Sequence, residues 1–421
     1  MTQDQALTIL KSGANVFLTG EPGSGKTHTV NQFVEWCRGK GKRVAITAST
    51  GIAATHINGQ TIHSWSGIGI KRKLDERDIE KILENDFKKR GITGADVLVI
   101  DEISMIDAST LDMVNTVLCR ARNFMSDAPF GGLQVIFVGD FFQLPPVQDR
   151  NDKKKVKFAF EAASWAAAAP AVCYITEQHR QEDSVFLEVL TAMRNGSLKD
   201  KHIGHLEARD DIPVKTIETT VLYTHNADVD RENAIELEKI PGAPHVYDMS
   251  SQGHEYPVGL LKKQCLSPER LELKVGALVM FTRNNWDTGY VNGTIGTVVE
   301  FGGNGTPVVE TKDGKRIFVV EAEWKFVNAH GQTTASIKQL PLRLAWAMTV
   351  HKSQGMSLDQ AHIDLSRAFE YGQGYVALSR VRSLAGLTLE GFNKKALQMH
   401  PTIVKIDKEF RKLSEQTLKN V

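Results

Sequence analysis

The segment that constrains this chain most is Val16–Val30, VFLTGEPGSGKTHTV, in which a short apolar run stops at a glycine-rich turn. The turn, Gly20–Thr27, has the GxxxxGK[ST] spacing of a phosphate-binding loop. Glycines let the backbone curl with its N–H groups around phosphate oxygens, and the helix expected next points the positive end of its dipole at the same oxygens. The pattern therefore predicts a nucleoside triphosphate site between a buried strand and a helix.

The residue types of this loop predict individual roles. Lys26 is expected to reach the β- and γ-phosphates, and the Thr27 hydroxyl is expected to ligate Mg²⁺. The residues expected to bind the nucleotide through the loop are Gly20, Gly23, Ser24, Gly25, Lys26, Thr27 and His28. Upstream, Gln5 is a candidate for an adenine contact, and a solvated side chain is an equal alternative.

A second buried strand, Val97–Asp101, ends in the adjacent carboxylates of Asp101 and Glu102. Because neighbouring side chains on a strand point in different directions, each carboxylate can have its own role. We expect Asp101 to hold Mg²⁺ and Glu102 to activate the attacking water as a general base. A carboxylate pair at a strand end, downstream of a phosphate loop, is what the second half of an NTP hydrolysis site requires.

Two further apolar strands, Arg43–Thr47 and Gln134–Asp140, complete the predicted first domain. Gln143 follows the latter strand and is a candidate sensor of the γ-phosphate. Strands that alternate with helices in this way predict a doubly wound parallel sheet, whose ligands bind at the carboxyl edge. We place this α/β domain at residues 1–170.

An insertion at about 59–75 breaks the strand–helix rhythm of this domain. It carries His63 and Trp65, followed by the basic run at 71–73. Aromatic faces for base stacking beside cations for phosphates are typical of single-strand binding. The alternative is that Trp65 anchors the core and that 71–73 is a solvated face.

The second half of the chain indicates another α/β domain without a phosphate loop of its own. Val221–Thr224 and His362–Leu365 are expected to be buried strands, with a helix at Ala227–Leu237. The nucleotide role of such a domain is to supply arginines across a cleft, for which Arg180 and Arg380 are the candidates.

Residues 265–335 interrupt this second domain. Short β-rich runs are separated there by the turn-forming stretches NG, GGNGTP and KDG, a pattern typical of closely spaced antiparallel strands. We therefore place the second α/β domain at 171–264 and 336–421, with a small β-barrel at 265–335 inserted in it.

Composition restricts the partners and the compartment. The 421 residues carry a net charge of +1, so any nucleic-acid binding must come from local patches. The cysteines lie far apart without a CxxC motif, as is typical of reduced cytosolic thiols. The N-terminus has no signal-peptide pattern, and the alanine-rich run Ala162–Ala171 is too short to span a bilayer. We expect the chain to stay in the compartment where it is made, and the cysteines indicate that this is the cytoplasm.

Taken together, these stretches resemble a superfamily-one helicase, and within it the Pif family of 5′-to-3′ DNA helicases. GEPGSGKT, ASTGIAA, IDEISM and GDFFQLPPV are similar to motifs I, Ia, II and III, and TIHSWSGIG is similar to a DNA-contacting segment of the family. TEQHRQ, LAWAMTVHKSQGMSL and YVALSRVR resemble motifs IV, V and VI. The resemblance runs almost from end to end of the chain. Without long extensions it implies a minimal helicase core, expected in the cytoplasm of a bacterial or phage-infected cell.

The resemblance implies two RecA-like domains, a barrel of the Src-homology-three type, and an ATP- and Mg²⁺-dependent helicase that acts in DNA repair, recombination and telomere maintenance. Its partners would be single-stranded DNA and forked or tailed duplexes, bound by a monomer. The implied catalytic residues are Lys26, Glu102, Gln143, Arg180 and Arg380, and Gly355 joins the nucleotide-binding residues. The implied DNA-binding residues are Thr50, Gly51, His63, Trp65, His351, Lys352 and Ser353.

Two rival functions share the phosphate loop and the carboxylate pair. One is a nucleotide-driven switch that grips DNA or protein without unwinding, and the other is a P-loop kinase. A switch needs only one nucleotide domain, and a kinase would need an acceptor site and a lid in place of the paired domains. Two inter-domain arginines and the aromatic-basic insertion favour the motor.

Overall fold

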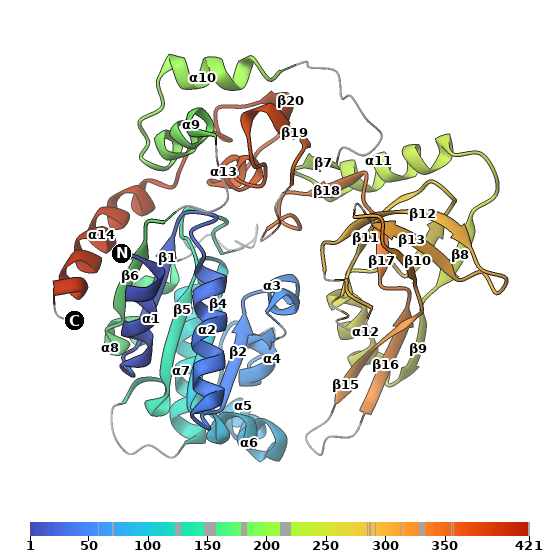
Figure 1. The fold of residues 1–421 in the computed structure, drawn as a ribbon. Helices are drawn as coiled ribbons and strands as arrows, with labels where there is room; N and C mark the ends of the chain where they lie inside the picture. Colours follow the sequence, from blue (N-terminus) through green and yellow to red (C-terminus); the bar gives the residue numbers. More distant parts are fainter. Residues whose placement is uncertain are drawn as a thin grey trace.

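The computed structural model describes residues 1–57, 59–69, 71–122, 128–146, 157–177, 183–210, 220–283, 285, 288–290, 292–311, 313–327, 333–354, 356 and 358–419. These residues form two α/β units and a β-rich module (Figure 1). In the view of Figure 1 the first unit lies below the second, and the module lies to the right of both.

The first unit is built on a six-stranded sheet with the strand order β3-β2-β4-β5-β1-β6. Each strand in it runs parallel to its neighbours. Its strands are β1 (Val16–Gly20), β2 (Val44–Ala48), β3 (Gln60–Thr61), β4 (Val97–Asp101), β5 (Gln134–Val138) and β6 (Ala171–Ile175). This sheet, with helices on its faces, confirms the predicted doubly wound α/β fold.

Helices cover both faces of this sheet because successive strand residues point to opposite sides. Val16 and Leu18 of β1 pack in one core with α1 and α2, whereas Phe17 belongs to the core on the other face, which includes α4 and α7. The helices of the unit are α1 (Gln3–Lys11), α2 (Lys26–Gly39), α3 (Gly51–His56), α4 (Ile62–Ser66), α5 (Glu76–Glu84), α6 (Asp86–Gly94), α7 (Ala108–Ala121) and α8 (Ala163–Ala168). Short 3₁₀ turns lie at η1 (Ile103–Met105), η2 (Pro129–Gly132) and η3 (Ala159–Glu161).

The second unit has a four-stranded parallel sheet in the order β18-β7-β19-β20. Its strands are β7 (Thr220–Tyr223), β18 (Ala347–Thr349), β19 (Ala361–Leu365) and β20 (Leu387–Phe392). Its helices are α9 (Ser184–Arg194), α10 (Asp200–Glu207), α11 (Asn226–Lys239) and α13 (Gln373–Leu378), with a 3₁₀ turn η4 (Leu384–Gly386). The predicted second α/β domain is therefore present.

The edge between the two units differs from the predicted boundary at 170. Strand β6 pairs with β1 along its whole length, so the first sheet continues to Ile175. The last helix, α14 (Pro401–Lys419), was expected in the second domain but lies beside β6 (Figure 1). Phe410 of α14 packs against Phe17 and Phe141 of the first unit, with ring centroids 5.0 and 6.1 Å away. The amphipathic pattern of a helix does not reveal which sheet its apolar face will cover.

The β-rich module lies between α11 and β18 in the chain. It contains a five-stranded sheet in the order β14-β13-β12-β11-β17, a two-stranded sheet β10-β8 and a three-stranded sheet β15-β16-β9. Its elements are β8 (His245–Asp248), β9 (Ser250–Gly253), α12 (Glu255–Gln264), β10 (Arg270–Leu273), β11 (Leu278–Phe281), β12 (Ile295–Phe301), β13 (Pro307–Thr311), β14 (Arg316–Phe318), β15 (Ala322–Val327), β16 (Thr333–Gln339) and β17 (Leu342–Leu344).

The module is larger than the predicted insertion at 265–335, because β8 pairs with β10 and β9 pairs with β16. These two pairings join segments that are far apart in the chain, so spacing along the sequence does not reveal them. The Src-homology-three type of the barrel stays a prediction. Across the described ranges, no helix is long and apolar enough to cross a bilayer.

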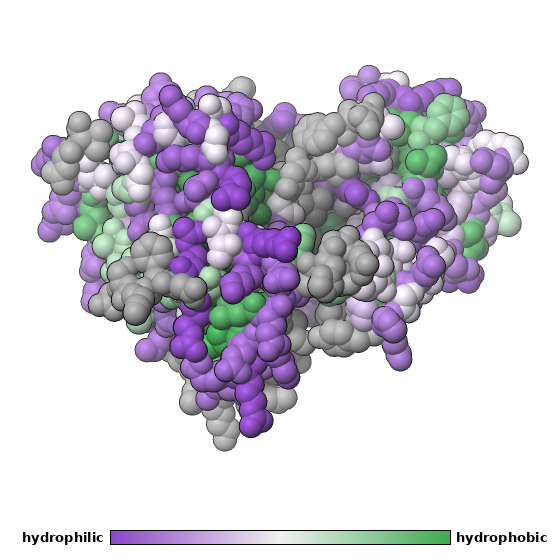
Figure 2. Space-filling view, turned by 90° about the horizontal axis from the view of Figure 1, so that it is seen from below, coloured by the Kyte–Doolittle hydropathy of each residue, from purple (hydrophilic) through white to green (hydrophobic). Residues whose placement is uncertain are grey.

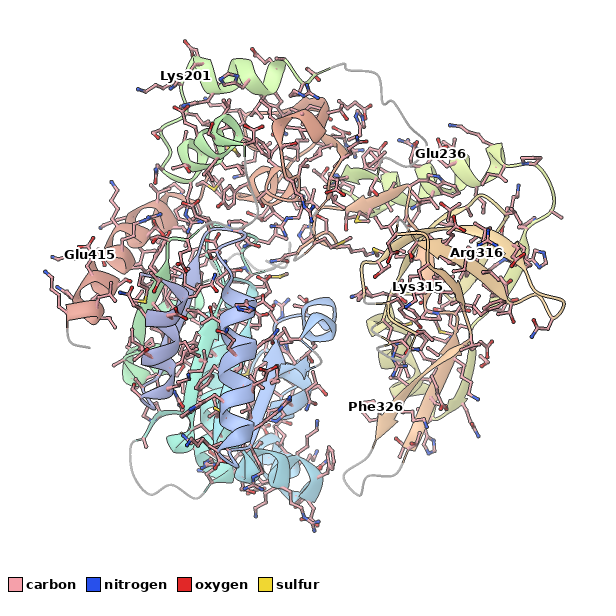
Figure 3. All side chains as sticks on the ribbon, in the orientation of Figure 1. Lys201, Glu236, Lys315, Arg316, Phe326 and Glu415 are labelled. Atoms are coloured by element: carbon pink, nitrogen blue, oxygen red, sulfur yellow. The ribbon has the colours of Figure 1, made fainter. Side chains whose placement is uncertain are left out.

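One face of the molecule is mostly hydrophilic. Seen from below in Figure 2, it has its hydrophobic residues in small groups. Figure 3 marks Lys315 and Arg316 at the start of β14 and Phe326 near the far end of β15. The Phe326 side chain is 37% exposed, so the module offers an aromatic ring as well as charges to solvent.

The packing of α14 can be tested through Phe410. We expect Phe410→Ala to lower the free energy of unfolding by about 3–5 kcal/mol, since the ring is buried against several aromatic side chains. Leu413 on the same helix is 45% exposed, so Leu413→Ala should change it by about 0.5 kcal/mol or less. Urea unfolding followed by circular dichroism measures both variants. Equal losses would contradict the anchoring role of Phe410.

Candidate active site

The loop between β1 and α2 adopts the conformation that its glycines were expected to permit. Gly23 and Gly25 have φ angles of 87° and 85°, in the left-handed region that side chains disfavour. A Cβ atom at Gly20 would lie 2.5 Å from a backbone oxygen of β6, so only glycine fits there. The buried Ser24 hydroxyl has no hydrogen-bond partner within the described residues. The loop thus combines a curled backbone with an unsatisfied donor, which suits phosphate oxygens.

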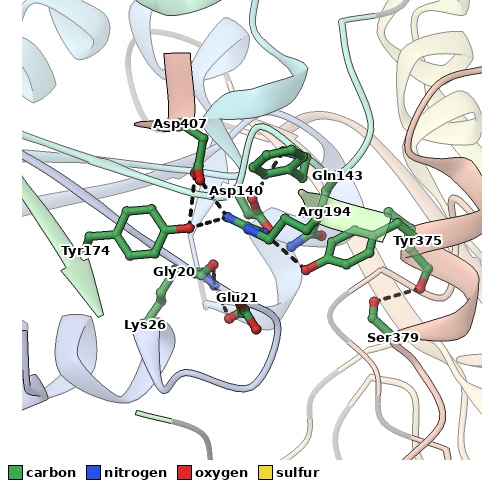
Figure 4. Close-up of polar contacts among 12 residues, drawn as sticks. Gly20, Glu21, Lys26, Asp140, Gln143, Tyr174, Arg194, Tyr375, Ser379 and Asp407 are labelled. Atoms are coloured by element: carbon green, nitrogen blue, oxygen red, sulfur yellow. Dashed lines mark hydrogen bonds and ion pairs between the residues drawn. The ribbon is translucent and has the colours of Figure 1, made fainter. Parts of the chain in front are cut away.

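Lys26 is the first residue of α2 and its ammonium group lies across this loop (Figure 4). Its Nζ donates to the carbonyl oxygens of Gly20 and Glu21 at 2.8 and 3.0 Å. Thr27 and His28 follow in the first turn of the helix, and both are exposed. The charge of Lys26 is therefore directed at the place where the loop would hold phosphates.

The structure brings Gln3, not Gln5, against the loop. The Gln5 side chain accepts a hydrogen bond from the Thr2 backbone at 2.9 Å, as part of a capping box that begins α1. Gln3 Nε2 donates to the Ser24 carbonyl at 3.3 Å and lies against Gly25. The adenine contact of Gln5 therefore stays a prediction, and its side-chain oxygen is already used by its own helix.

Asp101 and Glu102 lie where β4 ends, close to Lys26. The Glu102 backbone N–H donates to Asp101 Oδ1 at 2.8 Å, and Glu102 has a φ of 51°, which is uncommon for a residue other than glycine. Burial raises the pKa of Asp101 to about 6. Burial and the charge of Asp101 raise the pKa of Glu102 to about 7, whereas Lys26 acts to lower both values. Such a pKa suits a general base near neutral pH.

This corner also fits Mg²⁺. The described residues contain no cluster of three histidine, cysteine or acidic side chains that would enclose a metal by themselves. Mg²⁺ commonly takes only one or two protein ligands and completes its shell with waters and substrate phosphates. Asp101 beside the loop, with Thr27 in the first turn of α2, is a donor set of that kind.

Gln354 reaches this corner from the second unit. It lies in the turn that follows β18, and its Nε2 donates to Glu102 Oε2 at 3.0 Å and to Gln143 Oε1 at 3.4 Å. Gln143 is buried and lies beyond β5, as predicted. The family resemblance implied that the stretch 351–354, in HKSQG, links contacts with single-stranded DNA to the ATP cleft, but it assigned Gln354 no individual role. The two units therefore meet at the side chain expected to activate water.

Arg380 is buried at the end of α13 and is folded onto its own unit. Its guanidinium donates to the carbonyl oxygens of Val376 and Met356 at 2.9 and 3.3 Å. Its charge nevertheless acts to lower the pKa of Glu102, which places it within electrostatic range of the corner. The predictions for Arg180 and Gly355 fall outside the residues that the structure describes.

A buried ionic cluster that was not predicted lies behind this corner (Figure 4). Its centre is Arg194 of α9, which is 1% exposed. Around the guanidinium are Asp140, Tyr174, Tyr375 and Asp407, and we call these five residues the Arg194 cluster. Its only sequence signal is Asp140, which lies two residues beyond the end of β5.

The residues with predicted DNA contacts differ in their access to a ligand. Thr50 immediately precedes α3, and its hydroxyl accepts a hydrogen bond from the Ala53 N–H at 3.2 Å, whereas Gly51 is the first residue of the helix. His351 and Lys352 are half-buried in the turn after β18. Ser353 is buried and donates to the Val350 carbonyl at 2.9 Å, so its side chain holds the turn together.

Trp65 is in the core rather than on the surface. It is 6% exposed and packs in the main hydrophobic cluster, so the alternative of a core anchor describes it correctly. A base cannot stack on a ring so enclosed. His63 on the same helix α4 is half-exposed, and Lys71 of the basic run forms an ion pair with Asp78.

Burial lowers the pKa values of three of these side chains. It lowers the pKa values of His63 and His351, so both are neutral at pH 7. Burial, assisted by the charge of Arg343 and opposed by that of Asp230, lowers the pKa of Lys352 to about 8. Lys352 is therefore mostly charged at pH 7 and loses its proton as the pH rises above about 8.

Comparison with known proteins agrees with this architecture. The model of the PIF1-like helicase family matches residues 3–203, and the model of the 2B domain of DNA helicase Pif1 matches 259–301, inside the β-rich module. An ATP-dependent DNA helicase Pif1 from Psychrobacter sp. (strain PRwf-1) is 39% identical over 98% of this chain and 71% of its own length. An ATP-dependent DNA helicase PIF1 from Xenopus laevis is 37% identical over 97% of this chain, which spans 64% of that relative's length.

Solved structures give the same result. The crystal structure of Pif1 helicase from Candida albicans superposes with a TM-score of 0.85 at 33% identity, covering 97% of this chain and 98% of that one. Bacteroides Pif1 bound to single-stranded DNA superposes with a TM-score of 0.72 at 30% identity, covering 99% and 97%.

Proposed function

The chain belongs to the PIF1-like helicase family, and from this membership we propose that it moves along single-stranded DNA from 5′ to 3′ and separates the complementary strand. It is an ATP-dependent DNA helicase, as the relatives that match nearly the whole of this chain are named. The observation that carries the mechanism is the contact of Gln354 with Glu102, because it joins the second unit to the side chain that activates water.

The first unit binds the nucleotide. The loop Gly20–Gly25 surrounds the phosphates with backbone N–H groups, and Lys26 leaves its carbonyl partners to reach the β- and γ-phosphates. Gln3, packed on the loop, is a further candidate for the contact expected of Gln5. Thr27 and Asp101 would hold Mg²⁺, which when bound neutralises charge between the phosphates.

Hydrolysis needs residues from both units. Glu102 takes a proton from the attacking water, and its raised pKa prepares it for that step. The Gln354 side-chain amide is hydrogen-bonded to both Glu102 and Gln143, so the two glutamines help to position the Glu102 carboxylate. Arg380 stabilises charge on the transferring phosphoryl group once the second unit closes, and Arg180 is proposed for the same purpose from its motif alone.

The DNA track is proposed along the edge of both units. Thr50 and Gly51 at the start of α3 would contact the strand from the first unit. His351 and Lys352 would contact it from the second, with Lys352 supplying the charge. His63 remains a candidate for a neutral contact, whereas Trp65 and the Ser353 side chain do not, because both are enclosed.

Family membership favours the motor over a switch or a kinase. The 5′-to-3′ direction, the monomeric state and the cytoplasmic location in a bacterial or phage-infected cell stay predictions, since residue chemistry does not reveal them. The bacterial source of several relatives supports the bacterial part of that location.

The central test compares duplexes that carry a single-stranded tail at one end. With ATP and Mg²⁺, we expect a 5′-tailed duplex to be opened and a 3′-tailed duplex to remain closed. Strand separation can be followed by fluorescence, together with phosphate release with and without single-stranded DNA. Lys26→Ala is the matched control, and it should bind DNA but release no phosphate. Opening of the 3′-tailed duplex alone would contradict the direction, and ATP turnover without strand separation would favour the switch.

Arg380 can be separated from the ATP-binding residues by kinetics. We expect Arg380→Ala to lower kcat at least about 100-fold with little change in KM for ATP, because the guanidinium acts on the transition state. Steady-state ATPase assays with saturating single-stranded DNA measure both constants. A raised KM with an unchanged kcat would mean that Arg380 serves binding and not chemistry.

Lys352 predicts a pH dependence of DNA binding. Its pKa in the free protein is about 8, so the ammonium group that a phosphate requires is largely lost between pH 7 and pH 9. We therefore expect affinity for single-stranded DNA to fall several-fold over this interval. Lys352→Arg, which keeps its charge, should lose much less. Fluorescence anisotropy at constant ionic strength measures both proteins, and identical pH profiles would exclude Lys352 as a charged contact.

A further inference from the structure

The Arg194 cluster connects the two segments that flank the ATP site from different units. Arg194 Nη1 donates to Asp140 Oδ2 at 2.7 Å and to the Tyr375 hydroxyl at 3.1 Å. Asp140 stands three residues before Gln143, and Tyr375 lies in α13, the helix that leads to Arg380. The Arg194 guanidinium therefore bridges the loop that carries Gln143 and the helix that leads to Arg380 (Figure 4).

The same loop makes two further contacts, one with Arg194 itself and one with the residue that precedes α13. The Arg194 guanidinium lies over the Phe142 ring, 4.1 Å from its centroid. Gly372, which precedes α13, has a φ of 76°, and a Cβ atom on it would lie 2.5 Å from the Phe142 carbonyl oxygen and 2.8 Å from that of Gln143. The start of α13 is therefore in close contact with the loop, and neither can shift alone.

The rest of the cluster fixes the bridge in place. Arg194 Nη2 donates to the Tyr174 hydroxyl at 2.8 Å, and Asp407 of α14 lies 3.5 Å from the same nitrogen. Asp140 and Arg194 are almost fully enclosed, so their charges are screened little by water. Burial also raises the pKa of Tyr375 well above its usual value, which keeps that hydroxyl neutral.

We propose that Arg194, acting through the Tyr375 hydroxyl, is a positioning residue that holds Arg380 in register with Gln143. This inference rests on the proposed function, because it depends on the roles of Gln143 and Arg380 in ATP hydrolysis. It assigns no contact with the nucleotide to Arg194 itself. When a γ-phosphate engages Gln143, the displacement passes through Asp140 and Arg194 to α13 and so to Arg380. Hydrolysis would then depend on the bridge although neither of its ends touches ATP.

Tyr375→Phe tests the link, because it removes one hydroxyl and leaves the buried carboxylates with their cation. We expect a fall of about tenfold in kcat for DNA-stimulated ATP hydrolysis, with KM for ATP and affinity for single-stranded DNA unchanged. Tyr371→Phe is the matched control, because Tyr371 stands four residues earlier and its ring contacts Lys395 and His400. An unchanged kcat in Tyr375→Phe, or equal losses in both variants, would overturn the proposal.

A double variant distinguishes positioning from a general structural effect. If Tyr375 acts only through Arg380, adding Tyr375→Phe to Arg380→Ala should cause no further loss of kcat, whereas independent effects would multiply. A multiplied loss would overturn the proposal. If Arg380→Ala alone has full activity, the proposed catalytic role of Arg380 fails instead.

A measurement without turnover tests the link directly. A non-hydrolysable ATP analogue should slow amide hydrogen exchange in α13 of the parent chain and of Tyr371→Phe, but not in Tyr375→Phe. Equal protection in all three proteins would overturn the proposal even if the activities differ.

Discussion

Burial of two adjacent carboxylates at the end of β4 is the constraint on which the rest of this site depends. Asp101 and Glu102 keep raised pKa values because water is scarce around them, so positive or donor groups must surround them before a negatively charged substrate can approach. Lys26 supplies charge from the first unit, and Gln354 supplies a donor from the second. The carboxylates of the first unit therefore need a hydrogen-bond donor from the second unit.

Helix α14 makes further contacts between the two units. This helix ends the chain after the second unit, yet it packs Phe410 into the core of the first and brings Asp407 to the Arg194 cluster. Ser414 accepts a hydrogen bond from the Tyr174 backbone at 3.1 Å, which ties the helix to the edge strand β6. Helix α14 thus joins the two units through several side chains. The contact of Gln354 with Glu102 is made by a single side chain, so it can form and break when the units move.

Local patterns predicted the parts of the molecule whose chemistry is local. The phosphate loop, the carboxylate pair and Gln143 each follow a buried strand of a parallel sheet, so their shared edge follows from the strand pattern alone. Trp65 could not be assigned in this way, because its burial depends on how α4 packs in the main core. Gln5 had a usable signal, since Thr2 and Gln5 have the spacing of a capping box. Arg194 had none, because its partners come from four separate segments.

The order of segments after the β-rich module explains how a DNA strand and ATP could influence each other. Strand β17 belongs to the module, β18 belongs to the second unit, and the turn after β18 carries both Lys352 and Gln354. The Ser353 hydroxyl, bonded to the Val350 carbonyl, makes this turn a rigid piece. A ligand that pulls on Lys352 must therefore shift Gln354, and a shift of even an ångström would lengthen its 3.0 Å hydrogen bond to Glu102 beyond a useful distance. Coupling between the two sites then needs no long pathway, because one short turn belongs to both.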